Sequence, residues 1–214
     1  YMRQVGVFEA NPMTLVLEEM DESINTDPAR RDISIPEMRR FVATIGHPLE
    51  RALVVTLLKT GIRAGELCNL DRRDLALADS PDEFDEVRAA LDGRPDSIYV
   101  PPEPSVESTY NGEVRSASNK RKRATTIPVD DELAAVLRAW LAVRPDTRSP
   151  ARPLFCSTAD VWGARCTTDM VHHVVERHAR EMGWYETGGG PEENVTPHYF
   201  RHFFTTHLRD RTGE

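Results

Sequence analysis

Apolar residues recur at helical spacing along much of the chain, and this pattern predicts a mainly helical protein. The stretch 48–59 is apolar on nearly every face, so a largely buried helix is expected there, ended by Gly61 and followed by a second short helix. Ser34-Ile35-Pro36-Glu37 has the form of a helix start, with a capping Ser or Asp and an early Pro. Further helices are predicted at about 130–143, at 168–182 and from Pro197 onward.

Two short β-type runs interrupt the helical pattern. Residues 98–100 are predicted to form one strand, and residues 125–129 a second, which must lie at a sheet edge because Pro128 has no N–H to donate. The stretch 79–97 is acidic and rich in turn residues, which predicts a surface excursion. The expected architecture is α+β, mainly helical, with a small antiparallel sheet.

A junction is predicted near the N-terminus, at Thr26-Asp27-Pro28. Residues 1–26 are expected to form a helix and a turn, and residues 27–214 the main domain. The chain begins with Tyr, and no finishing element follows its last predicted helix, so both ends are expected to be cut from a longer chain.

Charge is the feature of the composition that most changes this picture. The 214 residues include 35 Asp and Glu against 27 Lys and Arg, for a formal net charge of −8. Only three of the basic residues are lysines and 24 are arginines, and such an acid-rich, lysine-poor surface suits a protein from a salt-adapted organism. Since the Debye length is only about 3 Å at 1 M salt, the net charge does not exclude DNA as a partner.

Membrane and disulfide-rich classes are not favoured. No apolar run approaches the roughly 20 residues that cross a bilayer, and the start has no signal-peptide core. Cys68, Cys156 and Cys166 form no tight pair of the kind found in a disulfide framework or a zinc ribbon. A cytoplasmic location is therefore predicted.

The first candidate site is Thr60 to Leu67, T-G-I-R-A-G-E-L. After the break at Gly61, Arg63 should lie in the first turn of a new helix, where free N–H groups and the helix dipole favour an anion such as phosphate. Glu66 lies three residues on, on the same face, and can hold Arg63 in position. The alternative is an ordinary Arg–Glu pair on the surface.

The second candidate site is Thr196-Pro197-His198-Tyr199-Phe200-Arg201-His202. Thr196 and Pro197 suit a helix start, which places His198 and Arg201 on one face of the first turn, again where phosphate is stabilised. A zinc pair of His198 and His202 lacks the Glu of H-E-x-x-H and a third ligand, so no metal is predicted. A purely structural helix cap stays open.

The third candidate site is Asn119-Lys120-Arg121-Lys122-Arg123, just before the second strand. Lysine can donate a proton near neutral pH whereas arginine cannot, and two of the three lysines lie here. A proton donor is one interpretation, and a solvated basic turn is the other.

Together and in this order, the three sites resemble the catalytic domain of the tyrosine recombinases, the phage integrase family. That family carries an Arg in T-G-x-R-x-x-E-L, a Lys in a β-hairpin, and H-x-x-R at the start of a later helix. Arg63, Lys120, and His198 with Arg201 match these motifs, and the family-like run F-F-T-T-H-L follows. The similarity extends from about residue 34 to residue 211, and it implies that residues 1–26 are the tail of an N-terminal core-binding (SAM-like) domain with its linker.

The resemblance implies metal-free phosphoryl transfer without a cofactor. Arg63 and Arg201 would clamp the scissile phosphate, and His198 would hydrogen-bond it and assist the nucleophile as base. Lys120 would protonate the 5′-oxygen leaving group, with Lys122 as the fallback. The supporting or DNA-contacting residues would be Glu66, Arg121, Lys122, Arg123 and His202. The partner would be double-stranded DNA, bound by a homotetramer of the complete protein and by a monomer of this fragment.

Two features depart from the family pattern. In the family, a Gly-His dipeptide and the nucleophilic Tyr follow H-x-x-R, the Tyr about thirty residues later, and both would fall beyond Glu214. Residues 27–214 are therefore expected to be a catalytic domain that is truncated before its nucleophile. Such a domain is expected to be inactive in cleavage. Arg63 and Lys120 are also farther apart than is usual in the family. The alternatives are a recombinase-derived DNA-binding or regulatory module, a type IB topoisomerase relative, and an unrelated helical metalloprotein.

Overall fold

The computed structural model describes residues 31–78, 87–159, 161–190 and 192–212. All of them belong to one compact unit that starts at Arg31. The predicted junction at residues 26 and 27 therefore lies outside the described residues. Residues 79–86 of the predicted acidic excursion lie outside them as well.

Helices account for most of the regular structure, as the apolar spacing predicts. Capping side chains fix several of the starts: Ser34 and Glu37 form a reciprocal capping box at the first helix, Asp130 accepts from Leu133 N–H at 2.9 Å, and Thr167 caps another helix in the same way. The α-helices are α2 (Ile35–Thr44), α3 (Pro48–Thr60), α4 (Ala64–Cys68), α5 (Asp131–Leu141), α6 (Thr168–Glu181) and α7 (Pro197–Thr212), and the short 3-10 helices are η1 (Arg72–Asp74) and η2 (Ala89–Leu91).

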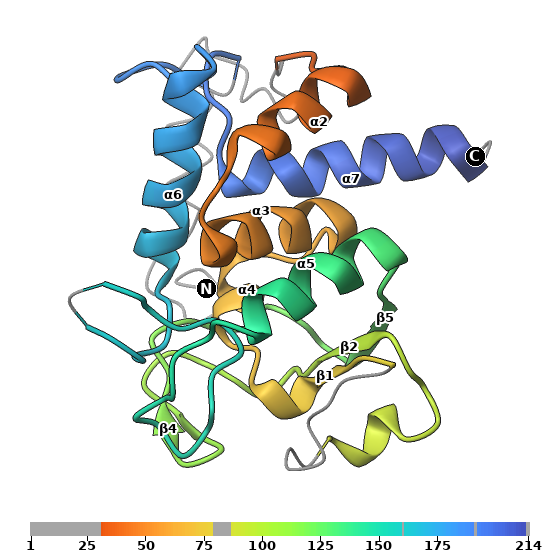
Figure 1. Ribbon diagram of the computed structural model, residues 1–214, viewed down its shortest axis with the longest axis vertical. Helices are drawn as coiled ribbons and strands as arrows, with labels where there is room; N and C mark the ends of the chain where they lie inside the picture. The colour runs from red at the N-terminus through yellow and green to blue at the C-terminus, as the bar shows by residue number, and fades with distance from the viewer. Residues whose placement is uncertain (1–30, 79–86, 160, 191, 213–214) are drawn as a thin grey trace, which may run out of the picture. The chain divides into compact units, whose positions relative to one another are not determined.

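Helix α3 is the centre of the core. Eight of its 13 residues are buried, which confirms the prediction of a largely buried helix, and it lies between α5 and α7 (Figure 1). Phe41 of α2 fills the space beside it, with ring centroids 5.3 Å from Trp184 and 5.9 Å from Phe200 of α7. Burying each such side chain stabilises the fold by about 1.5–3 kcal/mol, so these contacts fix the position of α7.

The sheet is small and antiparallel. Its three strands are β1 (Leu75–Ala76), β2 (Ser97–Val100) and β5 (Thr125–Pro128), in the order β1-β2-β5. Ile98 is opposite Ile127 and Ser97 is opposite Pro128. The strand β5 is an edge strand, as Pro128 predicts.

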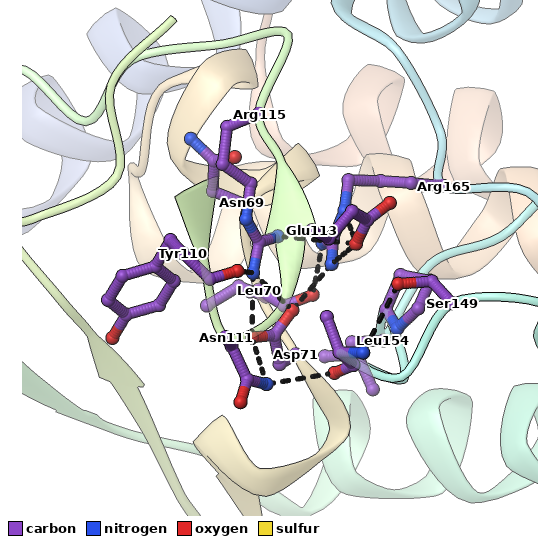
Figure 2. Close-up of polar contacts among 12 residues, drawn as sticks. Asn69, Leu70, Asp71, Tyr110, Asn111, Glu113, Arg115, Ser149, Leu154 and Arg165 are labelled. Carbon is purple, nitrogen blue, oxygen red and sulfur yellow. Dashed lines mark hydrogen bonds and ion pairs between the residues drawn. The ribbon is translucent and has the colours of Figure 1, made fainter. Parts of the chain in front are cut away.

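The connection from β2 to β5, residues 101–124, contains a second hairpin of β3 (Thr109–Tyr110) and β4 (Glu113–Val114). A buried ion cluster attaches this hairpin to the body of the protein (Figure 2). Its centre is Asp71, which accepts from Arg115 Nη2 at 2.9 Å and from Arg165 Nη2 at 2.6 Å. Lys120 follows the hairpin in the same connection, so the cluster also fixes where the segment that carries Lys120 begins.

Candidate phosphate-binding site

The site is built around the turn between α3 and α4. Gly61 ends α3 with φ +60°, a left-handed conformation that favours glycine. A Cβ at this position would lie 2.4 Å from Phe204 Cδ1 of α7, so the turn is in direct contact with that helix. Gly61 therefore brings the start of α4 against the first half of α7, two segments far apart in the sequence.

Arg63 lies at the N-cap of α4, one position before the first turn that the sequence predicts. Its backbone is extended, and its N–H donates to Glu66 Oε2 at 2.8 Å. The guanidinium Nη1 is 3.2 Å from Glu66 Oε1, and 42% of the side chain is exposed. The predicted pair of Arg63 and Glu66 is present, with part of the guanidinium facing solvent.

Glu66 is fully buried and has a second arginine partner. Arg121 Nε donates to Oε1 at 2.8 Å and Arg121 Nη2 to Oε2 at 3.2 Å, which is a bidentate fork. Arg121 Nη1 also donates to Thr125 Oγ1 at 2.8 Å, at the start of β5. The sequence suggested Arg121 only as a DNA contact, and its pairing with Glu66 was missed because nothing local links residues so far apart.

Arg201 completes the group from α7. Its Nη1 donates to the carbonyl oxygen of Gly61 at 2.6 Å. Burial lowers the pKa of Arg201, the positive charges of Arg63 and Arg121 lower it further, and the carboxylate of Glu66 opposes them. Arg63 and Arg121 thus pair with Glu66, and Arg201 lies near enough to be influenced by all three charges, so the cluster has three guanidinium groups against one carboxylate and an excess of positive charge.

The remaining predicted residues flank this cluster. His198 is exposed in the first turn of α7, one turn before Arg201 and on the same face, and the half-buried His202 follows Arg201. Lys120, Lys122 and Arg123 are exposed on either side of Arg121. Lys120 lies in the loop before β5 rather than in the β3–β4 hairpin, although β2 and β5 that flank the loop are antiparallel neighbours.

The arrangement is suited to a bound anion. A guanidinium offers two parallel N–H donors to phosphate oxygens. The buried carboxylate keeps its arginine partners oriented, and the excess of positive charge is left for a ligand. Across the described ranges, no group of three or more His, Cys, Asp or Glu side chains is placed to hold a metal ion.

Comparison with known structures defines the class of fold. The integrase of transposon Tn1549, solved in complex with transposon right end DNA, matches with a TM-score of 0.65 at 20% identity, over 95% of this chain and 60% of that chain. The XerA recombinase matches with a TM-score of 0.58 at 22% identity, over 91% and 53%. At these identities the likeness establishes the fold, which is that of a tyrosine recombinase catalytic domain.

Sequence comparison gives the family. The model of the phage integrase family matches residues 107–212. Tyrosine recombinase XerC 1 of Ralstonia nicotianae is 33% identical over 107 residues, which are 47% of this chain and 29% of that protein. XerC of Thermodesulfovibrio yellowstonii is 22% identical over 219 residues, which are 97% of this chain and 57% of that protein. Residues 107–212 thus match the phage integrase family, the similar proteins are tyrosine recombinases, and the chain spans less than two thirds of the length of these relatives.

Proposed function

We propose that this chain is the catalytic domain of a site-specific DNA recombinase and that the arginine cluster binds the scissile phosphate of double-stranded DNA. The observation that carries the proposal is that Arg63 and Arg201, which are far apart in the sequence, lie near each other beside the buried Glu66. The curated relatives are tyrosine recombinases, which supports the same reaction here. By the same resemblance, the full-length protein is proposed to act in the cytoplasm as a homotetramer on DNA.

The proposed reaction is transfer of a phosphoryl group from a DNA 5′-oxygen to a tyrosine and back. A tyrosine oxygen forms a bond to phosphorus, the bond between phosphorus and the 5′-oxygen breaks, and that oxygen takes a proton from the ammonium group of Lys120. Arg63 and Arg201 stabilise the negative charge that develops on the phosphoryl oxygens, and His198 hydrogen-bonds the phosphate and takes the tyrosine proton.

We further propose that the described tyrosines are not nucleophiles. The Tyr199 hydroxyl donates to the Arg31 carbonyl oxygen at 2.7 Å, and burial raises its pKa to about 12. The ring of Tyr185 lies 4.6 Å from the Arg180 guanidinium, which covers it. Tyr99 and Tyr110 both contact Arg88. These four tyrosines are therefore expected not to become covalently attached to DNA.

The test uses the full-length protein and a DNA site recovered from a random duplex library by binding selection. A nicked duplex of that site traps the covalent intermediate, which is measured on a denaturing gel. Arg63→Ala and Arg201→Ala should each lower the rate of covalent attachment by about 10²-fold or more, because each removes a donor to the transition-state charge. Binding of the intact duplex should change far less.

Arg180→Ala is the matched control. This arginine is 44% exposed, and its hydrogen bonds go to Glu176 and Thr187 rather than to the cluster. Attachment should continue at the normal rate in this variant. Normal attachment by Arg63→Ala or by Arg201→Ala would contradict the assignment of the phosphate site.

A further inference from the structure

The segment that leads to Lys120 runs alongside the C-terminal end of α4 and is hydrogen-bonded to it. Asn69, the residue that ends α4, is 1% exposed. Its Nδ2 donates to the Ala117 carbonyl oxygen at 2.8 Å and to Asn119 Oδ1 at 2.9 Å. Asp71, two residues further on, holds Arg115 at the other end of the segment (Figure 2). The side chains of Asn69 and Asp71 thus both hold the segment 115–119.

Asn119, the neighbour of Lys120, is fixed on its other side as well. Its Nδ2 donates to the Pro101 carbonyl oxygen at 2.7 Å, and its backbone N–H donates to the Pro104 carbonyl oxygen at 2.8 Å. The side chain is 7% exposed. The residue before Lys120 is therefore hydrogen-bonded both to the C-cap of α4 and to the residues that follow β2.

The residue after Lys120 is bound to the same helix. Arg121 forms the fork with Glu66, which lies in α4. Within α4, a Cβ on Gly65 would be 3.0 Å from the Ser118 carbonyl oxygen, so the helix and the segment are in close backbone contact. Lys120 is exposed, but its two neighbours are both hydrogen-bonded to this part of the chain, Asn119 to the C-cap Asn69 and Arg121 to Glu66 of α4.

Asn69 is buried, and packing alone does not require a polar side chain at this position. Its Oδ1 has no hydrogen-bond partner among the described residues, so burying this amide carries a desolvation cost while both Nδ2 hydrogens are used on the segment before Lys120. Lysine has a long flexible side chain, and fixing its backbone reduces the conformational entropy that it loses when the ammonium reaches a leaving group.

We propose that Asn69 is a positioning residue that sets the distance between the phosphate clamp at Arg63 and the proton donor Lys120. This inference rests on the proposed function, since it gives Lys120 the role of protonating the 5′-oxygen. It predicts that loss of Asn69 impairs proton donation specifically and leaves phosphate binding by the arginines intact.

The experiment compares two nicked substrates, one with the ordinary 5′-oxygen at the cleaved bond and one with sulfur in its place. A thiolate leaves without a proton donor. In the full-length protein, Lys120→Ala should slow attachment to the oxygen substrate by about 10²–10⁴-fold and leave the sulfur substrate unaffected. Asn69→Ala should slow the oxygen substrate by about 10²-fold, again with full rescue by sulfur. The double variant should be no slower than Lys120→Ala alone, because both changes remove the same step.

Asn194→Ala is the control for a general loss of structure. Asn194 is also a buried asparagine, and its Nδ2 holds another loop through the carbonyl oxygens of Glu186 and Gly189 at 3.0 and 2.8 Å. Any slowing in this variant should be equal for the two substrates. The melting temperature of each variant shows that it is folded, and Asn69→Asp, which keeps the size but removes the donors, provides a second variant.

Two results would overturn the inference, and they are distinguishable. Equal slowing of both substrates by Asn69→Ala, with selective rescue of Lys120→Ala, would show that Asn69 is only structural and would leave the proposed function intact. Failure of sulfur to rescue Lys120→Ala would remove the proton-donor role itself, and the positioning role with it. Selective rescue of Lys122→Ala instead would have the same consequence.

Discussion

At the scale of single residues, two buried carboxylates differ in how exposed their arginine partners are. Glu66 and Asp71 are both fully buried, and each pairs with two arginines, Glu66 with Arg63 and Arg121 and Asp71 with Arg115 and Arg165. The partner Arg63 of Glu66 is 42% exposed, so its guanidinium can reach a ligand. The partners of Asp71 are covered, since Arg115 is 0% and Arg165 6% exposed. The first carboxylate orients a site, and the second holds the fold together.

Asp71→Asn should strongly lower the free energy of unfolding. The Nε and Nη1 atoms of Arg115 have no hydrogen-bond partner among the described residues, so the charge of this arginine depends mainly on Asp71. Removing one partner of a buried ion pair costs about 3–5 kcal/mol, because the other charge stays buried. Urea unfolding followed by tryptophan fluorescence measures the change.

Glu132→Gln is the matched control on the surface. Glu132 is 63% exposed and pairs with Lys59, and such pairs contribute about 0–1 kcal/mol. A loss in Asp71→Asn no larger than the loss in this variant would show that the buried cluster does not stabilise the protein.

At the scale of elements, the turn between α3 and α4 determines how three helices meet. Gly61 ends α3, contacts Phe204 of α7 and accepts the hydrogen bond from Arg201. One left-handed residue therefore sets the start of α4 and the place of Arg201 together. The proposed phosphate site depends on this turn as much as on the arginines themselves.

Gly61→Ala should reduce both stability and activity. The left-handed conformation costs a non-glycine residue about 1–2 kcal/mol, and the added methyl group would also push Phe204 away. Urea unfolding should show at least that loss, and covalent attachment to the nicked duplex should slow even where the variant is fully folded.

Gly46→Ala is the comparison for this turn. Gly46 has open space around the position of a Cβ and no left-handed backbone, so the change should be neutral or stabilise the protein by about 0.4–1 kcal/mol. Unchanged stability in Gly61→Ala would contradict the proposed role of the turn.

At the scale of the whole molecule, charge is unevenly distributed. The chain has a net charge of −8, yet the candidate site carries excess positive charge, and the exposed residues Lys120, Lys122 and Arg123 extend it. An acidic protein of this kind repels DNA except where a local basic surface is presented, so we expect the proposed DNA contact to be at these residues. In the part of the chain that the structure describes, no helix is long and apolar enough to span a bilayer.

DNA binding by the full-length protein should weaken linearly as the logarithm of salt concentration rises. If Lys122 and Arg123 each contact one phosphate, replacing either by Ala should reduce the steepness of that dependence by about 0.9. Fluorescence anisotropy over a salt series measures the slopes, with Arg180→Ala expected to leave the slope unchanged. Slopes that are identical in all variants would place the DNA away from residues 120–123.

The sequence by itself determined the local features of this protein. Apolar spacing and capping residues predicted the helices, Pro128 predicted the edge strand, and Arg63 with Glu66 was recognisable because three residues on a helix are neighbours. The order of the motifs indicated the family. Apart from the order of the motifs, each of these signals lies within a few residues of what it predicts.

Only the tertiary structure decided which distant residues meet. The fork from Arg121 to Glu66, the bond from Arg201 to Gly61 and the hold of Asn69 on the segment before Lys120 all join parts of the chain that are far apart in sequence. Such contacts depend on how α3, α4 and α7 pack and on the path of the connection 101–124. No local pattern specifies that packing, because it results from the summed burial of the whole core.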